Sequence, residues 1–278
     1  MGELLFAGLG LRDERDLSLR ATEELRRCDR VFLEEYTSRS SPGTAARLAE
    51  LLSRPVETLG RAALEAERVV LEPLSRGERV GLVVVGEPFA ATTHLSLRLS
   101  AERAGHTWRV LHNASILTAA PSLAGLSLYK FGRVVSLPAP HEGYEPRSPY
   151  DGIAANRAAG LHTLVLLDLD VEVGRYLEAG EALRVLASLE LRYRSGVLLP
   201  GTEVVALARV GSESPEILAG PWEIVAATPL GPALHTLLLP QPPLHFLEEE
   251  ALSRWRRRLL GSAPPGTRGT ANPSAARP

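Results

Sequence analysis

The sequence predicts an α/β fold with mostly parallel sheets, and three observations support this. Short apolar, β-branched runs alternate with segments that have helical spacing, which is typical of βαβ units. The run from Gly81 to Gly86 has no polar interruption, as expected for a central strand buried on both faces. A second alternating series follows residue 113, so we expect two domains, each with its own sheet, over residues 1–113 and 114–260.

The first domain opens with an apolar strand, Leu4–Ala7, and a glycine-containing turn, Gly8–Leu11. Asp13 stands where a dinucleotide fingerprint needs its third glycine, so that fingerprint is not matched. The pattern further predicts helices near 18–27, 44–53, 64–74 and 93–105, and extended segments near 31–36, 56–59, 81–86 and 108–111.

In the second domain, the proline-rich segment 138–149 is predicted to be a loop. Around it the pattern predicts helices near 116–126, 150–159, 179–193 and 246–260, with strands near 134–137, 163–168, 204–210 and 234–239. Residues 261–278 are rich in Pro, Gly, Ala and Ser, and are predicted to be a disordered tail.

Composition excludes several classes of function. The net charge of −2 argues against nucleic acid as the main partner, because tracking phosphates needs a basic excess. The single cysteine, Cys28, rules out an internal disulfide and favours the cytoplasm. No apolar run has the length of a membrane span, so no membrane association is predicted.

The motifs of several reactions are missing. The chain has no P-loop and no G-x-S-x-G elbow, and its seven histidines lack metal-site spacing, so no metal is predicted. What remains is a set of loops with small residues at strand ends: Gly8–Leu11, Gly86–Ala90, Asn113–Ile116 and the loop after Val210.

The loop at Gly86-Glu87-Pro88 follows the central strand, where open α/β sheets bind ligands. Small residues let a ligand approach the backbone, which suits a heterocycle and a ribose better than a phosphate chain. Glu87 is then either an acceptor for a ribose hydroxyl or a cation, or a turn carboxylate that faces water.

The opening Gly8-Leu9-Gly10-Leu11-Arg12-Asp13-Glu14-Arg15-Asp16 resembles the start of the diphthine synthases, which are class III, tetrapyrrole-methylase-like methyltransferases. Further stretches are similar to the same family in the same order: Glu35–Ser38, Ala91–His94, Tyr129–Gly132, Gly160–Asp168 and Leu207–Ser212.

This resemblance implies two αβα domains with S-adenosylmethionine in the cleft between them. The positions that it implies as cofactor contacts are Leu11, Glu87, Ala90, Ser115, Ile116, Leu167, Val210 and His235. Two residues depart from the family pattern: Glu87 stands where aspartate is usual, and Ala114 where proline is usual. The longer Glu87 side chain predicts a shifted loop or a different contact.

The resemblance further implies repeated methylation of the α-amino group of a modified histidine on translation elongation factor 2, giving diphthine. It also implies a cytoplasmic, archaeal homodimer. Positioning provides most of the acceleration in such a displacement, so no catalytic residue is assigned. Thr92, Thr93 and His94 are candidates for orienting the acceptor.

Two alternatives remain open. One is a tetrapyrrole C-methyltransferase of the same fold, and the other is a non-catalytic scaffold that binds the cofactor.

Overall fold

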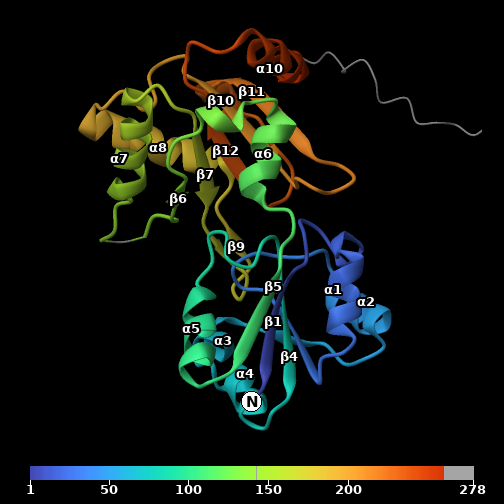
Figure 1. Cartoon of the computed structure of the whole chain (residues 1–278). Helices are drawn as coiled ribbons and strands as arrows, with labels where there is room; N and C mark the ends of the chain where they lie inside the picture. The colour runs from blue at the N-terminus through green and yellow to red at the C-terminus, as the bar shows by residue number, and fades with distance from the viewer. Residues whose placement is uncertain (142, 260–278) are drawn as a thin grey trace, which may run out of the picture.

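Two sheets organise the chain, one in each half (Figure 1). The computed structural model describes residues 1–141 and 143–259, so the predicted tail at 261–278 lies outside the described residues. The first sheet uses residues 3–111 and the second uses residues 135–239, as the two-sheet prediction requires. The boundary between residues 113 and 114 stays a prediction.

The first sheet has five strands in the order β3-β2-β4-β1-β5, and every pairing is parallel. Its strands are β1 (Glu3–Gly8), β2 (Arg30–Glu34), β3 (Glu57–Leu59), β4 (Arg79–Val84) and β5 (Thr107–Leu111). The predicted central strand is therefore confirmed as β4. Gly8 pairs with Val84 in the register of β1 and β4, so the loops after these two strands leave the sheet side by side.

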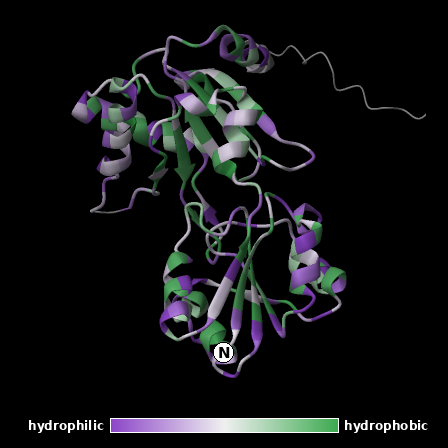
Figure 2. Ribbon diagram, in the orientation of Figure 1, coloured by the Kyte–Doolittle hydropathy of each residue, from purple (hydrophilic) through white to green (hydrophobic). Residues whose placement is uncertain are grey.

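Helices cover both faces of the first sheet. They are α1 (Leu19–Leu25), α2 (Thr44–Leu52), α3 (Arg61–Glu65), α4 (Arg68–Ser75) and α5 (Leu95–Arg103), with a 3-10 turn, η1 (Glu14–Asp16). Leu82 packs in the cluster that holds Leu74 and Leu97, whereas its neighbour Val83 packs in the cluster that holds Leu25 and Leu48. This two-sided burial explains why β4 has no charged residue from Val80 to Val84, and most of the strand is coloured towards hydrophobic in Figure 2.

The helix predicted at residues 64–74 is two helices, α3 and α4. Glu67 separates them because its backbone lies in the left-handed region, with φ of 57°, which a continuous helix cannot include. The spacing of apolar residues runs through the break and does not reveal it.

The second sheet has the order β11-β10-β12-β7-β6. Its strands are β6 (Val135–Leu137), β7 (Thr163–Leu167), β10 (Glu203–Ala208), β11 (Glu216–Pro221) and β12 (His235–Leu239). Only β6 and β7 pair in parallel, and the other three pairings are antiparallel. The prediction of a mostly parallel sheet is thus wrong for this half. The segment 209–215 joins β10 to β11 and is too short for a parallel crossover.

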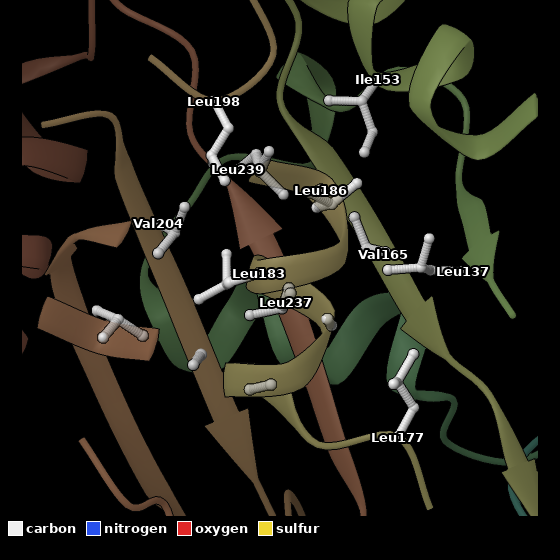
Figure 3. Packing of buried hydrophobic residues seen from close by; sticks show 14 of the residues in the cluster. Leu137, Ile153, Val165, Leu177, Leu183, Leu186, Leu198, Val204, Leu237 and Leu239 are labelled. Carbon is white, nitrogen blue, oxygen red and sulfur yellow. The ribbon is translucent and has the colours of Figure 1, made fainter. Parts of the chain in front are cut away.

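Helices also cover both faces of the second sheet. They are α6 (Ile116–Ala124), α7 (Arg147–Ala158), α8 (Ala179–Tyr193), α9 (Trp222–Ala227) and α10 (Phe246–Leu259), with a 3-10 turn, η2 (Leu128–Lys130). Figure 3 shows Leu183 and Leu186 of α8 beside Val165 of β7 and Leu237 of β12. On the other face, α6 and α10 bury Ala120 and Leu252. None of the described helices has the length and apolar character needed to cross a membrane.

A buried histidine ties α10 to this sheet. The Nδ1 atom of His162 accepts a hydrogen bond from the amide of Gln241 at 2.7 Å, and its Nε2 lies 3.2 Å from Glu248 Oε1. The histidine is therefore neutral, with its proton on Nε2. Its side chain is fully buried, and this desolvation lowers the pKa of His162 below its ordinary value of 6.5.

This lowered pKa predicts a loss of stability on acidification. Below pH 6.5, His162 is protonated in the unfolded chain but stays neutral in the folded protein. The free energy of unfolding therefore falls with pH until the pH reaches the lowered pKa. Urea unfolding from about pH 8 to about pH 5 measures this slope. His162→Gln does not titrate and should reduce the slope, and an unchanged slope contradicts the role of His162.

Candidate functional site

A cavity of about 470 Å³ lies between the two halves of the chain. The loops after β1, β2 and β4 line it from the first half, together with the start of α6. The ends of β7 and β10, the start of β12 and a short hairpin line it from the second half. This hairpin consists of β8 (Leu169–Asp170) and β9 (Arg175–Tyr176).

Every residue predicted as a cofactor contact lines this one cavity. They come from six separate loops or strand ends: Leu11, Glu87, Ala90, Ser115, Ile116, Leu167, Val210 and His235. The structure therefore brings together positions that are spread over more than 200 residues of sequence, from Leu11 to His235.

The first two loops are held together by backbone contacts. Gly10 and Gly86 form an antiparallel bridge, with N–O distances of 2.7 and 3.4 Å. Both have positive φ, +90° and +81°, which glycine adopts at little cost. At Gly8, an added Cβ would lie only 2.7 Å from both the carbonyl oxygen of Gly86 and Cβ of Asn113. The edge of the sheet therefore tolerates no side chain at this point.

Glu87 clamps the loop that follows β5. Its Oε2 accepts a hydrogen bond from the amide of Asn113 at 3.0 Å, and its Oε1 lies 2.8 Å from Nδ1 of His112. Asn113 in turn donates to the carbonyls of Gly8 and Asp16 at 2.8 and 2.9 Å. Glu87 thus has protein partners in this structure, and the reading of a turn carboxylate that faces only water is wrong.

The first loop also contacts the second half. Arg12 forms ion pairs with Asp13 at 3.4 Å and with Glu213 at 3.0 Å. The pKa of the Asp13 carboxyl is lowered, mainly by its hydrogen bond from Arg15. An added Cβ on Gly211 would lie 2.5 Å from Cβ of Leu11. Leu11 therefore packs directly against the backbone of the loop after β10.

His235 is held in a neutral form. Its Nδ1 accepts a hydrogen bond from the amide of Ala179 at 3.2 Å, so the proton is on Nε2, which donates to the carbonyl of Gly231 at 3.0 Å. Burial lowers the pKa of His235. With both ring nitrogens bonded to backbone, the imidazole offers the cavity a ring surface, not an acid or a base.

The three residues proposed to orient an acceptor have different positions. Thr92 lines the cavity, and Thr93 Oγ1 lies 2.6 Å from the hydroxyl of Tyr36. His94 is buried: its Nδ1 donates to the carbonyl of Pro88 at 2.9 Å and its Nε2 lies 3.7 Å from Glu34 Oε2. His94 is not in the cavity lining, so its position favours a packing role.

The loop after β2 forms a wall of the cavity that the sequence did not predict. Residues 37–42 line the cavity, and Glu34 fixes the start of this loop. The buried carboxylate of Glu34 accepts hydrogen bonds from the amides of Tyr36 and Thr37, at 2.5 and 2.6 Å, and from the Thr37 hydroxyl at 2.7 Å. The far end is held by the amide of Ser41, which donates to the carbonyl of Arg12 at 2.9 Å.

Comparison with known proteins identifies the family. Residues 3–224 match the model of the Tetrapyrrole (Corrin/Porphyrin) Methylases. A diphthine synthase from Methanothermobacter thermautotrophicus is 39% identical over 249 residues, which are 90% of this chain and 94% of that protein. One from Methanocella arvoryzae is 38% identical over 93% of this chain and 100% of that protein.

A crystal structure of diphthine synthase superposes with a TM-score of 0.81 at 31% identity, covering 93% of this chain and 100% of that chain. The chain belongs to the diphthine synthases of the tetrapyrrole methylase family.

Family membership makes the chain a methyltransferase, as the sequence motifs implied. It also confirms the fold class of two α/β halves. The residues missed by sequence reasoning are the loop 37–42, the β8–β9 hairpin and the segment 232–234. The polar run from Thr37 to Gly43 after a strand was the available signal for the first of these.

The wall after β2 depends on Glu34, and this generates a prediction. Glu34→Ala leaves three donors without their acceptor, and each buried donor left unpaired costs about 1–3 kcal/mol. We expect the free energy of unfolding, measured in urea, to fall by about 3 kcal/mol or more.

The control is Glu57→Ala on β3, which removes a half-exposed carboxylate whose ion pair with Arg30 is 3.6 Å long. It should change stability by less than about 0.5 kcal/mol. Equal effects of the two substitutions contradict the role assigned to Glu34.

Proposed function

We propose that this methyltransferase uses S-adenosylmethionine to methylate the α-amino group of a modified histidine on translation elongation factor 2, repeatedly, until it is a quaternary ammonium. The observation that carries the proposal is the convergence of all the expected contact residues on one cavity between the two sheets. The similarity of the chain to diphthine synthases over at least 90% of its length supports the choice of acceptor.

The lining has the chemistry that the proposed cofactor needs. A volume of about 470 Å³ lies within the range of pockets that bury a molecule of this size. Leu11, Ile116, Leu167 and Val210 offer apolar surface for an adenine ring, and Ser115 adds a hydroxyl beside them. Gly86 lines the cavity and carries no Cβ, so a ribose can approach its backbone closely.

When bound, S-adenosylmethionine supplies a methyl group on a sulfonium, and the acceptor nitrogen forms the new N–C bond while the C–S bond breaks and its electrons stay on sulfur. The chain contributes positioning and the exclusion of water. Since both ring nitrogens of His235 are hydrogen-bonded to backbone, neither is available to take a proton from the acceptor. The proton released between successive methylations then passes to solvent.

The proposal includes a homodimer in the cytoplasm with elongation factor 2 as its protein substrate. The resemblance of the motifs to diphthine synthases supports each of these points. Homodimer formation can be tested by the mass of the protein in solution.

The function is tested on elongation factor 2 that carries the unmethylated precursor. Treatment with the enzyme and S-adenosylmethionine should add whole methyl groups to the modified histidine, which mass spectrometry of the peptide detects. A tetrapyrrole precursor, incubated in parallel with labelled cofactor, should gain no label. Methylation of the tetrapyrrole and not of the factor contradicts the proposal.

Glu87 provides a second test, which concerns the cofactor. Glu87→Ala releases the amide of Asn113 and the ring of His112, so the loop that carries Ser115 loses its clamp. We expect calorimetry to show S-adenosylmethionine binding about tenfold weaker, the effect of losing one charged hydrogen bond.

Glu87→Asp restores the carboxylate usual in the family and should bind within about threefold of the parent, since the charge and the acceptor oxygens remain. If Glu87→Ala and the parent enzyme bind the cofactor equally well, the hydrogen bonds of Glu87 to the loop after β5 have no role in the site.

A further inference from the structure

One part of the cavity wall is left free by the expected cofactor contacts. It consists of the loop 37–42 and the β8–β9 hairpin with Leu177. These two segments meet at Arg39, whose Nη1 donates to the hydroxyl of Tyr176 at 3.2 Å although the residues are 137 positions apart. The carbon of the guanidinium lies 5.7 Å from the centre of the Tyr176 ring. In Figure 1 the hairpin, labelled at β9, extends between the two halves.

Arg39 differs from the other charged side chains of the lining. Those four have partners: Arg12 with Asp13 and Glu213, Arg209 with Glu216, Glu87 with His112 and the amide of Asn113, and Asp168 with the amides of Ala139 and Leu169. Among the described residues, no carboxylate pairs with Arg39, whose side chain contacts the hydroxyl and the ring of Tyr176. The lining thus contains one cation whose charge is not balanced by a neighbour in residues 1–141 and 143–259.

The backbone that carries Arg39 is fixed on both sides. Glu34 binds the amides of Tyr36 and Thr37 before it, and the amide of Ser41 binds the carbonyl of Arg12 after it. The Ser40 hydroxyl also donates to the carboxylate of Glu35. A guanidinium on a fixed loop loses less entropy when it binds an anion, so the site is preorganised.

We propose that Arg39 binds the carboxylate of the acceptor amino acid and thereby selects the amine that is methylated. The inference rests on the proposed function. An α-amino group lies on the carbon next to a carboxyl group, and a guanidinium binds a carboxylate through two parallel hydrogen bonds. A lysine side chain has an amine without this neighbouring carboxylate and would lack the contact.

The same contact assists the reaction. A free carboxylate beside an amine stabilises its protonated form, whereas a nearby guanidinium opposes protonation. Methyl transfer needs the lone pair of the neutral amine. Arg39 therefore acts as a specificity residue that also lowers the pKa of the acceptor amine in the complex.

The test compares Arg39→Gln and Arg39→Lys with the parent enzyme, on elongation factor 2 that carries the unmethylated precursor. Loss of a charged, bidentate contact should raise KM for the factor about 10- to 100-fold. In Arg39→Gln, the limb of the pH profile of kcat, which reports groups in the bound complex, should move to higher pH. Arg39→Lys keeps the positive charge but cannot make the bidentate contact, so its KM should lie between those of Arg39→Gln and the parent.

Arg175→Gln is the matched control. It removes the same charge from the adjacent strand β9, where the half-exposed Arg175 lies 4.0 Å from Glu181 and is not part of the cavity lining. This variant should keep the KM and the pH profile of the parent. Urea unfolding of each variant should show unchanged stability, since Arg39 is exposed.

Calorimetry with S-adenosylmethionine alone separates the two carboxylates that Arg39 could bind. The proposal requires that Arg39→Gln bind this cofactor as the parent does. A loss of cofactor affinity as large as the loss in kcat/KM would show that Arg39 binds the carboxylate of the cofactor, and would overturn the inference. An unchanged KM for the factor would overturn it too. If the parent enzyme itself adds no methyl group, the proposed function fails as well.

Discussion

The close approach of three chain segments at one edge of the first sheet is the constraint on which the site depends. β1, β4 and β5 end together, and the loops that leave them are in close contact at Gly8, Gly10, Gly86 and the side chain of Asn113. Two of these glycines have positive φ, and Gly8 has no space for a Cβ. Of these residues, Gly86 lines the cavity, and because it has no Cβ a ligand can approach its backbone closely.

The second half closes the cavity by contacts at two separate places. On one side, Leu11 lies against Gly211 while Arg12 reaches Glu213. On the other, the β8–β9 hairpin reaches the first half through Tyr176, and Glu172 accepts a hydrogen bond from the amide of Arg61 at 3.2 Å. These contacts hold parts of the lining from both sheets around one space, so each half supplies only part of the site.

The sequence predicted the central strand, the turns at its end and the expected contacts because these depend on local features. β4 is apolar from Val80 to Val84 since it is buried on both faces, and glycine marks the turns that follow β1 and β4. Parallel strands direct their carboxyl ends to one edge, so loops far apart in the sequence were expected to meet there. In the structure, Leu11, Glu87 and Ser115 line the same cavity.

The rest of the fold and of the site depends on long-range contacts that local sequence patterns do not encode. An apolar run such as Val204–Ala208 fits either strand direction, so the antiparallel order of the second sheet was not foreseen. Glu34 lies in a run that otherwise reads as an ordinary strand, yet it is fully buried and fixes the loop that carries Arg39. The meeting of Arg39 with Tyr176 depends on how the hairpin reaches across the cavity, and no spacing in the sequence predicts it.

The distribution of charge in the lining suits the methyl transfer from a sulfonium that we propose. The two carboxylates of the lining, Glu87 and Asp168, are already bound by backbone amides. A free anion beside the sulfonium would stabilise the bound cofactor and hold its charge in place, whereas the reaction moves positive charge from sulfur to nitrogen. Interactions that favour the starting state as much as the transition state do not raise the rate. Carboxylates that are already bound by backbone amides avoid this, and in our proposal Arg39 provides the specificity.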